Sequence, residues 1–204
     1  MRVRRCGSRA ALVELDRIDE VLGLHAALRE RPPAGITELV PAARTLLVAF
    51  DPAQTGFDRI AGELAEVEPK PAEHPPGTEI LVEVHYDGAD LTEVATLTAL
   101  TEREVIERHT AAEYEVAFCG FSPGFGYLTG LDPILHLPRR TTPRTRVPAG
   151  AVGVAGEFTG VYPRESPGGW QLIGRTDLPV WDLSRNPPAL FQPGTPVRFV
   201  EAAS

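Results

Sequence analysis

Four arginines lie close together in a proline-rich stretch, residues 138–150, of a protein whose formal net charge is −8. Planar guanidinium groups bind carboxylates and phosphates through paired hydrogen bonds, and prolines restrict the loop that carries them. We therefore predict that Arg139 and Arg144 bind an anionic group of a ligand. Arg140 and Arg146 could alternate outward, so for these two we expect ordinary ion pairs at a solvated surface.

Aromatic rings alternate with glycine and proline at residues 118–128. Glycines allow the backbone to approach a ligand closely, and the rings offer a flat apolar wall. The candidate binding residues here are Phe121, Pro123, Phe125 and Tyr127. The alternative, which the residues leave equally open, is a hydrophobic turn whose rings fill the interior of a β-barrel.

A third segment, residues 160–176, surrounds a Pro-Gly-Gly sequence that predicts a tight turn. The backbone amides of such a turn can bind an anion. The candidate binding residues in this segment are Ser166, Gly168, Gly169, Trp170, Gln171 and Arg175. Ser166 lacks the G-x-S-x-G sequence of a nucleophile elbow, and no residue of the chain is assigned a catalytic role.

The composition argues against several classes of protein. The negative charge disfavours binding to nucleic acid or to anionic membranes. The 2 cysteines show no zinc-ligand spacing, so we predict no metal site. No apolar run suits a transmembrane helix or a signal peptide, which makes the cytoplasm the expected compartment. No phosphate-binding loop sequence is present, so we predict no independent ATP site.

The first part of the chain predicts a small α+β domain, with helices on one face of an antiparallel sheet. The expected elements are strands at 10–15, 36–40 and 45–50 and helices at 16–31 and 57–66. A stretch rich in proline and charge at 68–77 predicts a linker. We therefore place one domain at 1–76 and a second at 77–204.

The second domain begins with a strand at 80–84 and two helices at 90–97 and 101–110. Thr101 and Glu104 have the spacing of a capping box. After Tyr114, glycine and proline become dense and short apolar runs alternate with turns, which indicates a β-barrel or sandwich. His109 ends the second helix, where an imidazole more often interacts with the helix dipole than takes part in catalysis.

Five stretches of the chain resemble the family of the 5-oxoprolinase B subunit, also called allophanate hydrolase subunit 1, which includes sporulation-kinase inhibitors. They are GFSPGFGYL at 120–128, PRTRVPAGAVGVA at 143–155, TGVYP at 159–163, SPGGWQLIGRT at 166–176 and PGTPVRF at 193–199. The resemblance implies an α+β N-terminal domain followed by a mostly-β cyclophilin-like barrel. Two residues depart from the family's usual ones near the expected pocket: Ala151 replaces a serine and Phe158 a glutamine.

The resemblance further implies a hydrolase component of an ATP-dependent 5-oxoprolinase, the enzyme that opens the lactam 5-oxoproline to glutamate. The component by itself is expected to be inactive. The resemblance also implies a heteromeric complex with a homologous second subunit, the C-type subunit of 5-oxoprolinase, and with a third, catalytic subunit. ATP would bind only in this assembled complex. The alternative is a regulatory protein that inhibits a sensor histidine kinase. Prolyl isomerisation would rest on analogy of fold alone.

Overall fold

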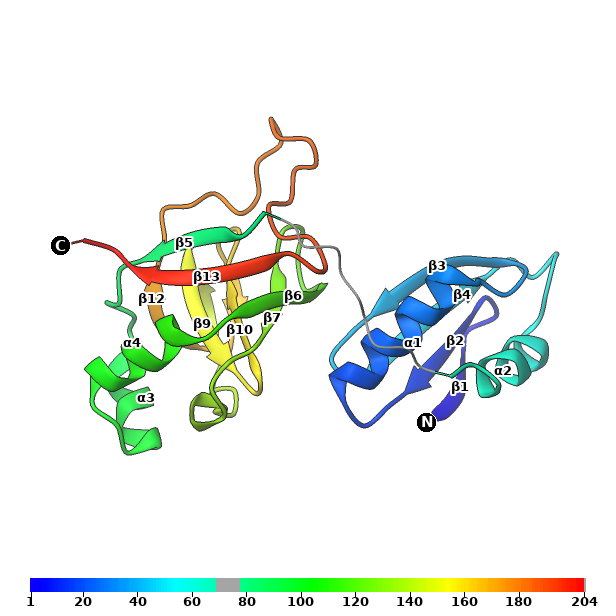
Figure 1. Ribbon diagram of the computed structural model, residues 1–204, viewed down its shortest axis with the longest axis horizontal. Coiled ribbons are helices and arrows are strands. Elements are labelled where there is room, and N and C mark those ends of the chain that lie inside the picture. The colour runs from blue at the N-terminus through cyan, green and yellow to red at the C-terminus, as the bar shows by residue number, and fades with distance from the viewer. Residues whose placement is uncertain (69–77, 204) are drawn as a thin grey trace. The chain divides into compact units, whose positions relative to one another are not determined.

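The computed structural model describes residues 1–68 and 78–203 (Figure 1). Contacts divide the chain into two compact units, Met1–His74 and Pro75–Ser204, each with its own hydrophobic core. Apart from Glu68, the predicted linker at 68–77 lies outside the described residues, so the domain boundary between 76 and 77 stays a prediction. Within the described ranges, no helix has the length and apolar character needed to cross a membrane.

The first unit contains an antiparallel sheet of four strands in the order β1-β2-β4-β3, together with two helices. Its elements are β1 (Arg2–Cys6), β2 (Ala10–Glu14), α1 (Ile18–Glu30), β3 (Ile36–Pro41), β4 (Thr45–Phe50) and α2 (Phe57–Ala65). One apolar stripe of each helix packs with inward residues of β2 and β4, for example Leu24 of α1 and Ile60 of α2 with Leu46. Strand β1 has no counterpart among the predicted elements.

The second unit is built on a sheet of seven strands in the order β12-β9-β10-β7-β6-β13-β5 (Figure 1). These are β5 (Ile80–Val84), β6 (Tyr114–Cys119), β7 (Gly126–Thr129), β9 (Ala151–Ala155), β10 (Phe158–Val161), β12 (Gln171–Arg175) and β13 (Pro196–Glu201). Beyond β5, His85 pairs with Arg175 at the end of β12 through two backbone hydrogen bonds of 2.8 and 2.9 Å. The sheet therefore nearly closes on itself, and the prediction of a mostly-β, barrel-like domain is confirmed.

Two helices, a 3-10 turn and a small separate sheet complete the described part of this unit. They are α3 (Leu91–Thr98), α4 (Glu102–Ala111), the 3-10 turn η1 (Pro133–Leu135), and the paired strands β8 (Arg144–Val147) and β11 (Ser166–Gly168). Helix α3 packs against β12 and α4 against β13. The predicted capping box is confirmed, because the Glu104 amide donates to the Thr101 hydroxyl at 3.2 Å and the Thr101 amide donates to the Glu104 carboxylate at 2.8 Å.

His109, in the last turn of α4, is fully buried, and its predicted interaction with the helix dipole is wrong. The Thr159 hydroxyl donates to the Gly153 carbonyl oxygen at 3.1 Å, so it accepts from His109 Nε2 at 3.0 Å. The Tyr86 hydroxyl then donates to His109 Nδ1 at 2.8 Å. Burial lowers the pKa of His109 to about 3, so the ring is neutral and carries no charge to complement the dipole.

Candidate binding site

A cavity of about 260 Å³ in the second unit brings together parts of all three predicted segments. The predicted binding residues that line it are Phe121, Phe125, Tyr127, Arg139, Gly168, Gly169 and Trp170. The lining residues that were not predicted to bind a ligand are Arg140, Pro143, Tyr162 and Pro167. The cavity is small and five of its eleven lining residues are aromatic, which suits a compact ring better than an extended chain.

The wall of the cavity is a set of interlocked aromatic rings. Phe125, Tyr162 and Trp170 are each almost fully buried. The Phe125 ring lies 5.2 Å from both other rings, at interplanar angles of 78° and 89°. Edge-to-face pairs of this kind are stabilising and fix the orientation of each ring. Phe125, the one ring of residues 118–128 in this set, therefore fills the interior as the second interpretation of that segment expects, and it also lines the cavity. The binding role of the segment stays a prediction.

Tyr162 is held in this wall by two backbone contacts. A side chain at Gly168 would place its Cβ 2.5 Å from the Tyr162 hydroxyl, so only glycine allows this close packing. Burial raises the pKa of Tyr162, and the hydrogen bond with the Trp170 backbone amide opposes that rise. The sequence signal for Tyr162 was its place in the TGVYP stretch, at one end of the third segment.

Phe121 lies at the rim of the cavity in a strained conformation. Its φ is 62°, in the left-handed region, and the residue is 59% exposed. Its ring contacts Phe125 edge-on at 5.4 Å between centroids. A left-handed non-glycine residue costs roughly 1–2 kcal/mol, and so exposed a ring recovers little of this by burial. Strained backbone conformations cluster at binding sites and ligand clamps, and the place of Phe121 at the cavity rim fits that pattern.

Arg139 brings a positive charge to the cavity that no carboxylate of residues 1–68 and 78–203 neutralises through an ion pair. Its side chain is exposed and hydrogen-bonds to Tyr127. Burial raises the pKa of Tyr127, while the charge and the hydrogen bond of Arg139 lower it. The charge of Arg139 is thus open to an anionic group at the cavity, and its role as a binding residue stays a prediction.

Arg140 differs from its prediction as a solvated surface residue. Its side chain lines the cavity and is only 27% exposed. Nη1 donates to the Asp90 carboxylate at 2.7 Å and to Glu93 at 2.8 Å. The loop is arranged with Arg140 inward because its backbone amide also donates to the Gly169 carbonyl oxygen at 2.7 Å.

Arg144 does not line the cavity, so the structure does not bring the predicted pair of anion-binding arginines together there. Its Nη2 donates to Asp90 Oδ1 at 2.5 Å, and the Asp90 side chain is only 2% exposed. Sequence spacing could not reveal this pairing, since the two residues are 54 positions apart. Arg146 behaves as predicted, with an exposed ion pair to Glu165 at 2.6 Å.

Four other candidates lie outside the cavity lining: Pro123, Ser166, Gln171 and Arg175. Arg175 is exposed and pairs with Asp87 at 3.0 Å and Asp177 at 3.8 Å. The Gln171 amide donates to the Pro138 carbonyl oxygen at 3.5 Å. The predicted tight turn is wrong, because Pro167 and Gly168 belong to β11, which pairs with β8.

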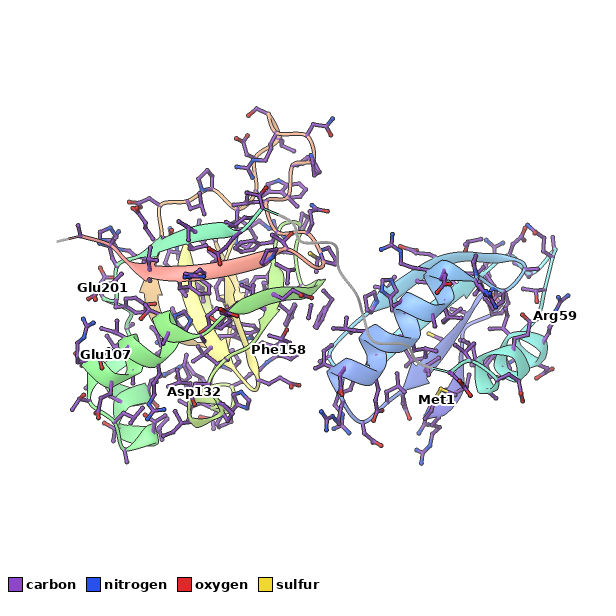
Figure 2. All side chains as sticks on the ribbon, viewed as in Figure 1. Met1, Arg59, Glu107, Asp132, Phe158 and Glu201 are labelled. Atoms are coloured by element: carbon purple, nitrogen blue, oxygen red, sulfur yellow. The ribbon has the colours of Figure 1, made fainter. Side chains whose placement is uncertain are left out.

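The two departures from the family pattern are buried residues of the seven-stranded sheet. Phe158, labelled in Figure 2, is buried and packs edge-on against Tyr127 at 5.6 Å between ring centroids. Ala151 is buried in β9. Neither residue lines the cavity. Across the described part of the chain, no group of three or more His, Cys, Asp or Glu residues could hold a metal ion.

Comparison with known proteins identifies the family. Residues 1–191 match the family described as carboxyltransferase domain, subdomain C and D. The chain is 44% identical over 169 residues to the 5-oxoprolinase B subunit of Escherichia coli O157:H7, covering 81% of this chain and 78% of that protein. It is 38% identical over 201 residues to the 5-oxoprolinase B subunit of Bacillus subtilis strain 168, covering 89% and 84%.

Solved structures of similar fold include both short and long chains. The protein PH0987 from Pyrococcus horikoshii is 35% identical with a TM-score of 0.60. The match covers 99% of this chain and 98% of PH0987. The protein TTHA0988 is 38% identical with a TM-score of 0.77, but 97% of this chain spans only 41% of it. Urea amidolyase of K. lactis shares the fold alone, with 20% identity, a TM-score of 0.78, and coverage of 98% of this chain and 15% of that one. The chain therefore belongs to the family of carboxyltransferase subdomains C and D, within the group of the 5-oxoprolinase B-subunit proteins.

Proposed function

We propose that this chain is the B subunit of an ATP-dependent 5-oxoprolinase, which opens 5-oxoproline to glutamate. The observation that carries the proposal is the aromatic cavity with Arg139, a guanidinium unneutralised within the described residues, in a chain 44% identical to a protein named as the 5-oxoprolinase B subunit. 5-Oxoproline is a five-membered lactam ring with one carboxylate. The ring matches the wall of Phe125 and Trp170, and the carboxylate matches Arg139.

The cavity does not fit ATP. Its volume of about 260 Å³ is below the range of about 300–1,000 Å³ that is usual for ligand pockets, and a triphosphate needs several cationic or amide partners. Arg140 and Arg144 are already paired with carboxylates. We therefore assign only the lactam to this cavity, and place ATP at a site completed by another subunit.

The partners in this proposal are a homologous C-type subunit of 5-oxoprolinase and a third, catalytic subunit. The proposed compartment of the complex is the cytoplasm. The sizes of related chains support such partners, since this chain spans 41% of TTHA0988 and 15% of the K. lactis urea amidolyase. The module thus also occurs within longer chains that carry additional parts. We further propose that the nearly closed sheet is a cyclophilin-like barrel. No observation favours the inhibition of a histidine kinase.

The test is ATP-dependent formation of glutamate from 5-oxoproline by the co-purified subunits, with each subunit omitted in turn. We expect glutamate only when this chain is present, because its cavity would hold the lactam. A complex that forms fully but turns over no 5-oxoproline would contradict the proposal. Turnover that continues without this chain would contradict it as well.

Two substitutions of Phe121 separate its binding role from its strain. Phe121→Ala and Phe121→Gly both remove the rim ring, so we expect a similar rise in KM for 5-oxoproline, about 5–20-fold. Only glycine also relieves the left-handed φ of 62°, so Phe121→Gly is expected to be more stable than Phe121→Ala by about 1 kcal/mol.

Steady-state kinetics of the complex and chemical unfolding of the isolated chain measure the two effects. Unequal KM values for the two variants would show that backbone strain, and not the ring, determines binding. Equal stabilities would show that Phe121 is not strained.

A further inference from the structure

Asp90 is a buried carboxylate on which three separate parts of the barrel unit converge. Oδ1 accepts from Arg140 Nη1 at 2.7 Å and from Arg144 Nη2 at 2.5 Å. Oδ2 accepts from the Leu172 backbone amide at 2.7 Å, and the Asp90 amide donates to the Leu172 carbonyl oxygen at 2.9 Å. The loop before β8, β8 itself and β12 are thereby connected through one side chain that is 2% exposed.

The Asp90 carboxylate does not serve the helix that it precedes. Asp90 is the N-cap residue of α3, yet its side chain makes no capping hydrogen bond. Aspartate is among the preferred N-cap residues because its carboxylate can accept from the first free amides of the helix. Here both oxygens are instead directed to the arginines and to β12, so helix capping does not explain the residue.

A close backbone approach holds Asp90 in this place. Gly88 packs so tightly on β12 that a Cβ there would collide with the carbonyl carbon of Ile173. The Gly88 amide also donates to the Ile173 carbonyl oxygen at 3.2 Å. The loop from 87 to 90 is thus fixed against the strand next to Trp170, and the position of the carboxylate is set by backbone contacts.

The charges around Asp90 leave the cavity with one net positive charge among its arginines. Arg140 and Arg144 are balanced by Asp90 and Glu93. Arg140 lines the cavity beside Arg139, which has no such partner among the described residues. Without Asp90, the long Arg140 side chain would be held only by Glu93, an exposed residue whose own side chain can move.

We propose that Asp90 is a positioning residue of the lactam site, which holds Arg140 against the cavity so that the bound ligand meets a fixed wall. This inference rests on the proposed function for its substrate. Asp90 does not touch the ligand and acts through Arg140. Its removal therefore changes ligand binding only to the extent that Arg140 contributes to it.

The kinetic test compares Asp90→Asn with Glu93→Gln in the assembled complex. Both changes remove one negative charge beside Arg140, but only the first weakens the buried contact. Asparagine has a single acceptor oxygen, whereas Asp90 uses both of its oxygens, one for the arginines and one for the Leu172 amide. We expect Asp90→Asn to raise KM for 5-oxoproline about 10-fold or more with kcat within about threefold, and Glu93→Gln to stay within about twofold of wild type. A merely structural role would reduce the amount of active protein and thus lower the apparent kcat with KM unchanged, and that result would overturn the proposal.

A double-mutant cycle tests whether Asp90 acts through Arg140. Arg140→Met alone is expected to raise KM to a similar degree, and the double variant Asp90→Asn/Arg140→Met should raise it no further. Fully additive effects of the two substitutions would contradict the proposal.

A second measurement works without turnover, so it separates this proposal from the proposed function. Phenylglyoxal labels accessible arginines, and peptide mass spectrometry locates the label. Arg140 should be labelled slowly in the wild-type chain and in Glu93→Gln, and at least about fivefold faster in Asp90→Asn. Equal protection of Arg140 in all three proteins would overturn the positioning role even if 5-oxoproline proved not to be the substrate. Wild-type turnover with an unchanged KM in Asp90→Asn would overturn it while leaving the proposed function intact.

Discussion

Replacing Arg139 with alanine is expected to raise KM for 5-oxoproline about 10–100-fold, with a smaller change in kcat. A charge-assisted hydrogen bond contributes about 1.5–3 kcal/mol, which corresponds to this range of affinity. Arg139 is the lining arginine without a carboxylate partner in the described part of the chain. Its charge is thus available to a ligand, whereas that of Arg140 is already balanced. Steady-state kinetics of the assembled complex measures the effect.

An analogue of the substrate that lacks the carboxylate provides the control for this prediction. 2-Pyrrolidinone has the same lactam ring without the carboxylate, so Arg139→Ala should leave its weaker binding nearly unchanged, measured as competition against 5-oxoproline in the wild type and in the variant. Arg146→Ala is the matched control in the protein. Arg146 belongs to the same arginine-rich segment but is exposed and paired with Glu165, so its removal should leave KM within about twofold. An equal loss of affinity for both lactams would show that Arg139 supports the fold of the site and does not bind the carboxylate.

Elements with a strong local signal were predictable from the sequence. The strand at Ile80–Val84 and the strand at Thr45–Phe50 are apolar runs with the expected length and bounds. The capping box at Thr101 fixes the start of α4 through contacts only three residues apart. β1 escaped prediction because its sequence, RVRRC, carries three arginines and its side chains are mostly exposed. Its place at the edge of the sheet is decided by pairing with β2, which a local pattern does not record.

The residues of the candidate site also differ in how far the sequence could predict them. The aromatic residues Phe125, Tyr127 and Trp170 were found because an unusual density of rings and glycines is visible within short segments of the sequence. The arginines were found as a group, but their individual roles were not. Which of them faces the cavity depends on Asp90, a residue 50 positions before Arg140 that the sequence marks only as the start of a helix. Long-range partners of this kind follow from the closure of the barrel and carry no local signature.

The stability of the barrel unit is expected to fall as the pH drops below about 6.5, and His109 is the reason. Burial lowers the pKa of His109 from 6.5 to about 3, so the folded chain cannot take up the proton that the unfolded chain binds. The contribution of the neutral His109 to stability is therefore fully present above pH 6.5 and is lost progressively as the pH falls toward 3. The slope is about 1.4 kcal/mol per pH unit, which gives a loss of about 2 kcal/mol between pH 7 and pH 5.

Chemical unfolding at pH 7 and pH 5, followed by tryptophan fluorescence, measures this loss. The signal reports on the barrel unit, because both tryptophans, Trp170 and Trp181, lie in the second unit. His109→Gln removes the titrating group, so most of the difference between the two pH values should disappear, although the variant starts from a lower stability. Tyr86→Phe is the control. It removes the hydrogen bond to His109 Nδ1 but keeps the buried imidazole, so it should be less stable at pH 7 by about 1 kcal/mol and still lose stability toward pH 5. If His109→Gln kept the wild-type difference, the acid sensitivity would have to come from carboxylates, and His109 would not be the neutral, buried group that its hydrogen bonds to Tyr86 and Thr159 describe.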